Sequence, residues 1–217
     1  MKKMLLISLL FSNLLIGSTL DDLRITDEDF ISISHSSQKN YVFDRINELM
    51  LLKKSLQDVD DDFIKLNEVN DFFNEYEYKT DNELYNKKDY WATRKEFIIK
   101  GAGDCEDYVI AKYFTLLELG IDESKLSIIH NIHNEEYHLV LGYQENKFSD
   151  VFILDNNNKE ILPLTKREDI LVLYTLETID LSDNNEIDIL GDLKNLSNYK
   201  WTQIYLKSKG RKLKLVN

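Results

Sequence analysis

The chain contains a single cysteine, Cys105, which directly follows Gly103 and Asp104. Behind it, apolar residues recur three or four positions apart: Val109, Tyr113, Leu116 and Leu117. With Gly120 as a C-cap, this spacing predicts a core helix over 105–119. A helix N-terminus favours a thiolate, because free backbone N–H groups and the helix dipole stabilise the anion. Cys105 is therefore a candidate nucleophile, and the competing interpretation is a buried, inert thiol.

A cysteine nucleophile needs a base, and the chain offers four histidines. His138 opens the apolar run 139–141, which predicts a strand whose first residue lies beside the helix start. His35 falls in a polar segment, whereas His130 and His133 flank a stretch that we expect to be a solvated turn. His138 is therefore the preferred base.

A third group must accept a hydrogen bond from the distal nitrogen of the histidine, so that it fixes the tautomer and steadies the imidazolium. Asp155 closes the apolar segment 151–154, which places it at the end of a neighbouring antiparallel strand. Asp150 and Asn156 are the alternatives. The three residues together predict a Cys–His–Asp triad.

The elements that must position these residues are helices in the first half of the chain and short strands in the second half, which is the pattern of an α+β domain. Residues 21–40 are polar and without periodicity, and we expect a leader or loop there. No internal repeat or linker divides the chain, so residues 19–217 are expected to form a single domain. The expected helices cover 44–56, 63–76 and 105–119, and the expected strands cover 126–132, 138–143, 151–154 and 170–178.

Composition and charge limit the binding partners and the cellular compartment that we expect for the chain. The 27 basic and 39 acidic residues give a formal net charge of -12, which disfavours nucleic acid as a partner. Residues 1–18 combine two lysines, a short apolar run and small residues, which predicts a signal peptide and no stable membrane insertion after its cleavage. The alternative is an uncleaved N-terminal anchor. A single cysteine excludes an intramolecular disulfide in an exported protein.

An ordered set of motifs resembles a known family, the bacterial transglutaminase-like cysteine proteinases of the LapG type, over about residues 69–169. The motifs are Asp89-Tyr90-Trp91-Ala92-Thr93, Gly103-Asp104-Cys105-Glu106-Asp107-Tyr108, Ala111-Lys112-Tyr113-Phe114, His138-Leu139-Val140-Leu141 and Leu154-Asp155-Asn156. The resemblance implies a papain-like or transglutaminase-like fold, with N-terminal helices and the nucleophile at the start of a core helix packed on an antiparallel sheet.

The resemblance also implies a function. Members of this family are calcium-dependent periplasmic endopeptidases that cleave a large surface adhesin near its N-terminus and so control biofilm release. An inner-membrane cyclic-di-GMP receptor acts as their inhibitor. Asp104, Glu106 and Asp107 would be the calcium ligands here, since carboxylate oxygens suit Ca²⁺. Spacing alone favours a different interpretation, in which Asp104 is the N-cap and Glu106 and Asp107 complement the helix dipole.

Two other functions remain open. A transglutaminase-type amide transferase uses the same triad and differs only in whether an amine or water attacks the acyl-enzyme. A catalytically silent module would keep calcium as a structural ion. Three carboxylates beside Cys105 oppose its thiolate by raising the thiol pKa, and calcium would cancel their charge.

Overall fold

We describe a computed structural model of the chain over residues 23–177 and 193–208. The predicted signal peptide lies outside these residues. The helices are α2 (Asp27–His35), α3 (Lys39–Leu56), α4 (Asp62–Asn74), α5 (Asp81–Tyr85), α6 (Arg94–Lys100), α7 (Cys105–Glu118) and α8 (Leu193–Ser208). The strands are β1 (Glu77–Tyr78), β2 (Ala102–Gly103), β3 (Leu126–His133), β4 (Glu136–Tyr143), β5 (Phe152–Leu154), β6 (Leu162–Pro163) and β7 (Ile170–Thr175). Among the described helices, none is long and apolar enough to cross a bilayer.

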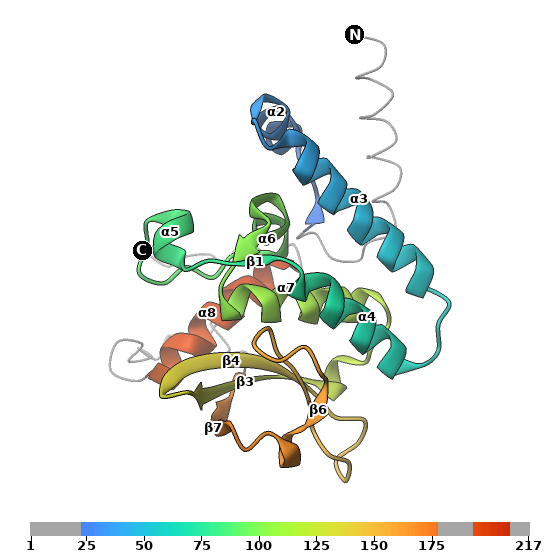
Figure 1. The fold of residues 1–217 in the computed structure, drawn as a ribbon, viewed down its shortest axis with the longest axis vertical. Helices are drawn as coiled ribbons and strands as arrows, with labels where there is room; N and C mark the ends of the chain where they lie inside the picture. Colours follow the sequence, from blue (N-terminus) through green and yellow to red (C-terminus); the bar gives the residue numbers. More distant parts are fainter. Residues whose placement is uncertain (1–22, 178–192, 209–217) are drawn as a thin grey trace.

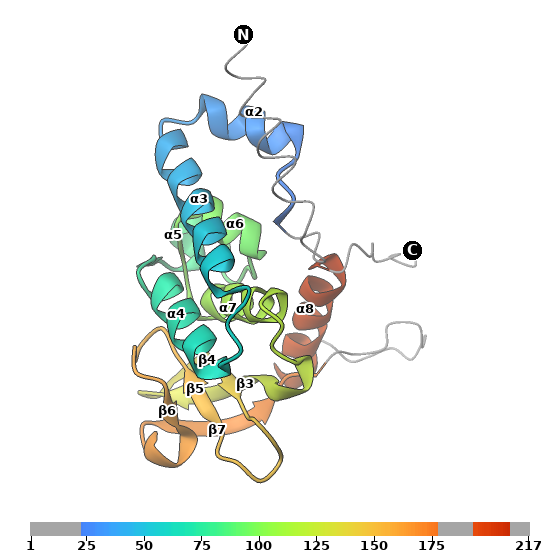
Figure 2. The ribbon, with the colours of Figure 1, turned by 90° about the vertical axis from the view of Figure 1, so that its right-hand side faces the viewer.

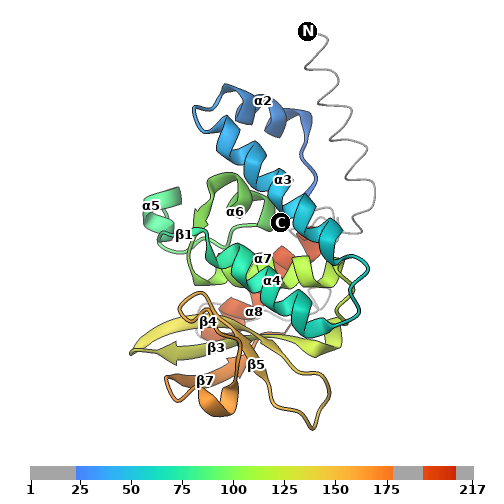
Figure 3. The ribbon, with the colours of Figure 1, turned by 45° about the vertical axis from the view of Figure 1, so that its right-hand side comes forward.

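The molecule is built in layers (Figure 1). The five-stranded sheet has the order β6-β5-β4-β3-β7, and every neighbouring pair in it is antiparallel. Helices α4, α7 and α8 cover one face of this sheet (Figure 2), and α2 and α3 lie on the far side of these helices (Figure 3). The expected α+β class is therefore confirmed, but the expected order of helices before strands is not complete, because α8 follows the last strand.

Helix α7 is the centre of the core. Its buried residues continue around the helix, because α4, α6 and β4 pack against different sides of it. Trp201 of α8 adds edge-to-face contact with Tyr113 and stacks on Phe114. The helix ends at Glu118, and Gly120 follows with a left-handed φ of 85°, which glycine adopts without a steric penalty. The expected helix over 105–119 is thus confirmed to within one residue.

The expected loop over residues 21–40 is wrong, because most of it is helical. Thr26 and Asp29 form a reciprocal capping box at the start of α2, and Lys95 of α6 binds the Asp29 carboxylate at 2.7 Å. Helix α3 also begins earlier than its periodicity indicated, at Lys39 rather than Asp44. Local capping and a tertiary ion pair stabilise α2, which the weak apolar pattern did not reveal.

The four expected strands are all present, with shifted ends. The expectation that His130 flanks the turn is wrong, because His130 lies within β3, inside the expected strand over 126–132, and only 4% of it is exposed. Its ring stacks on Tyr174 of β7, with ring centroids 4.9 Å apart. The turn between β3 and β4 consists of Asn134 and Glu135, both with positive φ, and His133 is the residue beside it.

Candidate active site

Cys105 is the first residue of α7 and follows the short strand β2. Asp104 is the N-cap, and its side chain and that of Asp107 form a reciprocal capping box around the helix start. Helix α7 packs on β4, and the backbone N–H of Leu139, the residue after His138, lowers the pKa of the Cys105 thiol. The cysteine therefore lies next to the strand that carries His138.

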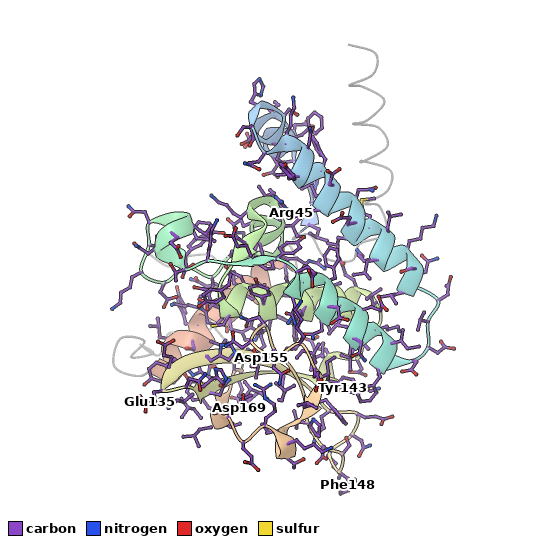
Figure 4. The ribbon with its side chains drawn as sticks, in the orientation of Figure 1. Arg45, Glu135, Tyr143, Phe148, Asp155 and Asp169 are labelled. Atoms are coloured by element: carbon purple, nitrogen blue, oxygen red, sulfur yellow. The ribbon has the colours of Figure 1, made fainter. Side chains whose placement is uncertain are left out.

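His138 and Asp155 meet on adjacent strands. His138 lies in β4 and Asp155 directly follows β5, which pairs antiparallel with β4. The His138 Nε2 and the Asp155 Oδ1 are 2.8 Å apart, and both residues are buried. Figure 4 places Asp155 between the helical layer and the outer part of the sheet. Because Nε2 faces the carboxylate, Nδ1 is the ring nitrogen available to a thiol.

Three donors hold the carboxylate of Asp155 in place, and a fourth holds its backbone. Besides His138, the backbone N–H of Asn157 donates to Oδ1 at 2.9 Å, and the Arg167 Nη2 donates to Oδ2 at 2.7 Å. Asn74 of α4 donates to the Asp155 backbone carbonyl at 2.8 Å. Burial raises the pKa of Asp155, but the hydrogen bonds from His138 and Arg167 outweigh burial and hold that pKa well below its usual range. Asp155 is therefore an ionised acceptor.

The alternatives to these residues are placed elsewhere. Asp150 lies outside the strands, and Asn156 contacts its neighbour Asn157 rather than a histidine. His133 is at the end of β3, with its ring 5.6 Å from that of His138, and its Nε2 is 3.3 Å from Asp169. The structure brings His138 and Asp155 together beside the helix start of Cys105, while the catalytic roles of all three remain predictions.

The three acids proposed as metal ligands belong to a larger acidic cluster. Asp104 and Asp107 converge with Asp81, so that oxygens of the three lie within 4.8 Å of one another. Glu106 converges in the same way with Asp81 and Asp89. Asp81 begins α5, and Asp89 belongs to the segment between α5 and α6. Asp81 was not identified from the sequence as a candidate metal ligand, and Asp89 was named only as part of a motif.

Two oxygens in this cluster, Asp81 Oδ1 and Asp104 Oδ1, are buried and make no hydrogen bond within residues 23–177 and 193–208. Burial and the neighbouring Glu106 raise the pKa of Asp104 to about 9. Burial and Asp107 raise the pKa of Glu106 to about 7. Converging carboxylates of this kind oppose one another unless a cation lies between them. Hard oxygen donors with orphaned lone pairs fit Ca²⁺.

The cluster also acts on the nucleophile. Burial, Glu106 and Asp104 raise the pKa of the Cys105 thiol well above its ordinary value, and the Leu139 N–H only partly opposes this. The Cys105 sulfur lies 3.2 Å from Glu106 Oε2. The conflict expected from the sequence, carboxylates against a thiolate, is therefore present in the folded chain.

Known proteins match this sequence and this fold. The profile of the bacterial transglutaminase-like cysteine proteinases matches residues 45–201. The solved structure of Legionella pneumophila LapG is 29% identical, has a TM-score of 0.62, and covers 81% of this chain and 93% of its own. Its EGTA-treated form is 30% identical with a TM-score of 0.64, covering 82% of this chain and 94% of its own.

The calcium-bound form of Legionella pneumophila LapG is also similar, with 30% identity, a TM-score of 0.60, and coverage of 79% of this chain and 94% of its own. A search of curated protein sequences returns no significant match. The matched profile spans every residue of the candidate triad and of the acidic cluster.

Proposed function

The chain belongs to the bacterial transglutaminase-like cysteine proteinases and is a cysteine protease, and we propose that Cys105, His138 and Asp155 are its catalytic triad. The observation that carries this proposal is the 2.8 Å bond between His138 Nε2 and Asp155 Oδ1, beside the helix start that bears Cys105. This bond leaves His138 Nδ1 to take the thiol proton.

In the proposed reaction, His138 removes the Cys105 proton and the sulfur attacks the scissile carbonyl. The imidazolium then returns its proton to the leaving amine, which leaves a thioester on Cys105. Water, deprotonated by His138, hydrolyses the thioester and regenerates the thiol. Asp155 stays ionised throughout and steadies the positive charge on His138, as its lowered pKa supports.

We propose that calcium is held by Asp104, Glu106 and Asp107 together with Asp81 and Asp89. Bound there, calcium would supply positive charge that offsets the carboxylates and favours the Cys105 thiolate. The orphaned oxygens of Asp81 and Asp104 support this assignment, as does the calcium-bound form of the Legionella protein. Glu106 and Asp104, which flank Cys105, couple the cation to the nucleophile.

The proposed substrate is a large cell-surface adhesin, cleaved in its N-terminal region in the periplasm. The test is to incubate the chain lacking residues 1–18 with that region of an adhesin from the same genome, with calcium or with EGTA. We expect one cleavage with calcium, none with EGTA, and none with Cys105→Ala or His138→Ala. His35→Ala, which changes an exposed histidine, is the matched control and should cleave normally. Cleavage by Cys105→Ala would refute the triad.

Regulation by an inner-membrane cyclic-di-GMP receptor, which the resemblance of the sequence motifs implies, is part of the same proposal. The periplasmic domain of such a receptor from the same genome should bind the protease and stop adhesin cleavage in a dose-dependent way. Cleavage that continues at saturating receptor domain would contradict this part of the proposal and leave the triad untouched.

A further inference from the structure

Arg167 is a buried cation outside the triad. It lies between the 3₁₀ turn Leu164–Lys166 and β7, and 3% of it is exposed. Its guanidinium bridges two carboxylates: Nη2 donates to Asp155 Oδ2 at 2.7 Å, and Nε and Nη2 donate to Asp169 at 2.9 and 2.7 Å. Asp169 in turn contacts His133. Figure 4 shows Asp169 on the side of Asp155 away from the helices.

We infer that Arg167 is a positioning residue that fixes the tautomer of His138 by acting through Asp155. This inference rests on the proposed triad. It concerns the direction of a hydrogen bond, which can be measured without any substrate.

The argument starts from the division of labour between the two oxygens of Asp155. Oδ1 accepts from the Asn157 backbone N–H and lies 2.8 Å from His138 Nε2, whereas Oδ2 accepts from Arg167. Arg167 and the Asn157 N–H are donors whatever the tautomer of His138, and both favour the ionised form of the carboxylate. An ionised Asp155 forces Nε2 of a neutral His138 to carry the hydrogen, and Nδ1 is then free to act as the base.

The carboxylate of Asp169 holds the guanidinium group of Arg167 in position. Asp169 binds Nε and Nη2 together, which fixes the guanidinium plane so that Nη2 also reaches Asp155. A lysine at this position could supply the charge but not the planar set of N–H donors with which the guanidinium binds both carboxylates. Because the Asp155 side chain is fully buried, its ionised form needs such a charged donor.

Asp155→Asn then has a specific consequence. Asparagine has one oxygen, and Arg167 and His138 face opposite ends of its amide. The charged guanidinium draws the oxygen to its own side, because hydrogen bonds to ions are about twice as strong as neutral ones. The amide NH₂ would then face His138 Nε2, and the imidazole would carry its hydrogen on Nδ1, the wrong nitrogen for a base.

Removing Arg167 from the Asp155→Asn protein should turn the asparagine amide around, so that its oxygen faces His138. In Asp155→Asn/Arg167→Met, the Asn157 N–H still points to the Oδ1 position and selects oxygen there. His138 Nε2–H regains its acceptor. Adding Arg167→Met should therefore restore the Nε2–H tautomer of His138 that Asp155→Asn removes. A merely structural role for Arg167 does not predict this recovery.

The spectroscopic test uses ¹⁵N-labelled histidine in calcium-loaded protein at about pH 8, well above the ordinary pKa of histidine. A Cys105→Ala background removes the thiol that would share its proton with His138. We expect the Nε2–H tautomer in this background, the Nδ1–H tautomer after Asp155→Asn, and Nε2–H again after Asp155→Asn/Arg167→Met. An Nε2–H tautomer in the Asp155→Asn protein overturns the inference, and this arm needs no change at Arg167.

The activity test uses adhesin cleavage with Cys105 intact. Asp155→Asn should lose on the order of 10²–10⁴-fold in kcat, the range that a positioned base contributes, and Asp155→Asn/Arg167→Met should recover at least about tenfold. Asp155→Asn/Lys166→Met, which removes an exposed neighbouring charge, should recover nothing. A double Arg167 variant no more active than Asp155→Asn contradicts the inference. If wild type itself cleaves no adhesin, the proposed function fails while the tautomer measurement still decides the role of Arg167.

Discussion

Asp104→Asn separates a metal ligand from a helix cap, because asparagine caps a helix as well as aspartate but is a far weaker calcium ligand. In the absence of calcium, burial and Glu106 raise the pKa of Asp104 from 3.8 to about 9. The ionised side chain is therefore disfavoured in the folded protein. Near pH 7 this destabilises the chelated protein by up to about 4 kcal/mol relative to a neutral side chain.

Asp104→Asn should therefore raise the Tm of the chelated protein. A change of 1 kcal/mol shifts Tm by roughly 2–4 °C at this size, so the upper bound is roughly 8–16 °C. The calcium-induced rise of the wild-type Tm should largely disappear, since calcium at about 100 times its Kd stabilises by about 2.7 kcal/mol only when the site is intact. Differential scanning calorimetry in EGTA and in calcium measures both effects.

Asp60→Asn is the matched control, because it removes the same charge at an exposed position in the loop before α4. It should leave the chelated Tm and the calcium shift as they are in wild type. If Asp104→Asn also leaves both unchanged, Asp104 serves only as the cap of α7 and the metal assignment is refuted.

Three further predictions follow from the same contacts. Asp104 and Glu106 have raised pKa values in the folded chain, so their contribution to stability is complete below their unfolded pKa and is lost as pH rises through the folded pKa. The Tm in EGTA should therefore fall between about pH 4 and pH 9. Calcium should make the Tm depend less on pH, and a series of melting curves at different pH values measures both effects. Gly103→Ala should weaken calcium binding in a titration, because its Cβ would lie 2.5 Å from Asp107 Oδ2 and 2.8 Å from the Phe97 ring; unchanged affinity would show that Asp107 is not a ligand. Lys112→Met should lower the free energy of unfolding by about 1–3 kcal/mol in urea, because the oxygens of Asn70 and Asn74 lose the buried ammonium that donates to them.

The sequence predicted the residues whose roles depend on local pattern. Cys105 opens a strongly periodic helix, and His138 and Asp155 stand at opposite ends of short apolar runs, so the strand pairing that joins them could be anticipated. The acids around Cys105 were visible for the same reason, because they are its neighbours in the chain.

The residues that were missed act over long sequence distances. Asp81 reaches the cluster because α5 lies beside β2, and nothing in its local sequence distinguishes it from a surface acid. Arg167 stands in a charged stretch typical of a solvated loop, yet it is buried, and the fold brings the Asp155 carboxylate to it in addition to its chain neighbour Asp169. His130 was expected to flank the turn, but β3 continues through the polar residues after it as far as His133.

The central claim is that His138 and calcium together make Cys105 reactive in a site whose carboxylates otherwise suppress it. The rate of iodoacetamide alkylation near pH 6 tests this directly, since Cys105 is the only cysteine in the chain. We predict fast alkylation of the calcium-loaded wild type. In EGTA or in His138→Ala the rate should be lower by at least about tenfold, which corresponds to a thiol pKa that is higher by about one pH unit or more. Equal rates in wild type and His138→Ala, with and without calcium, would contradict the account.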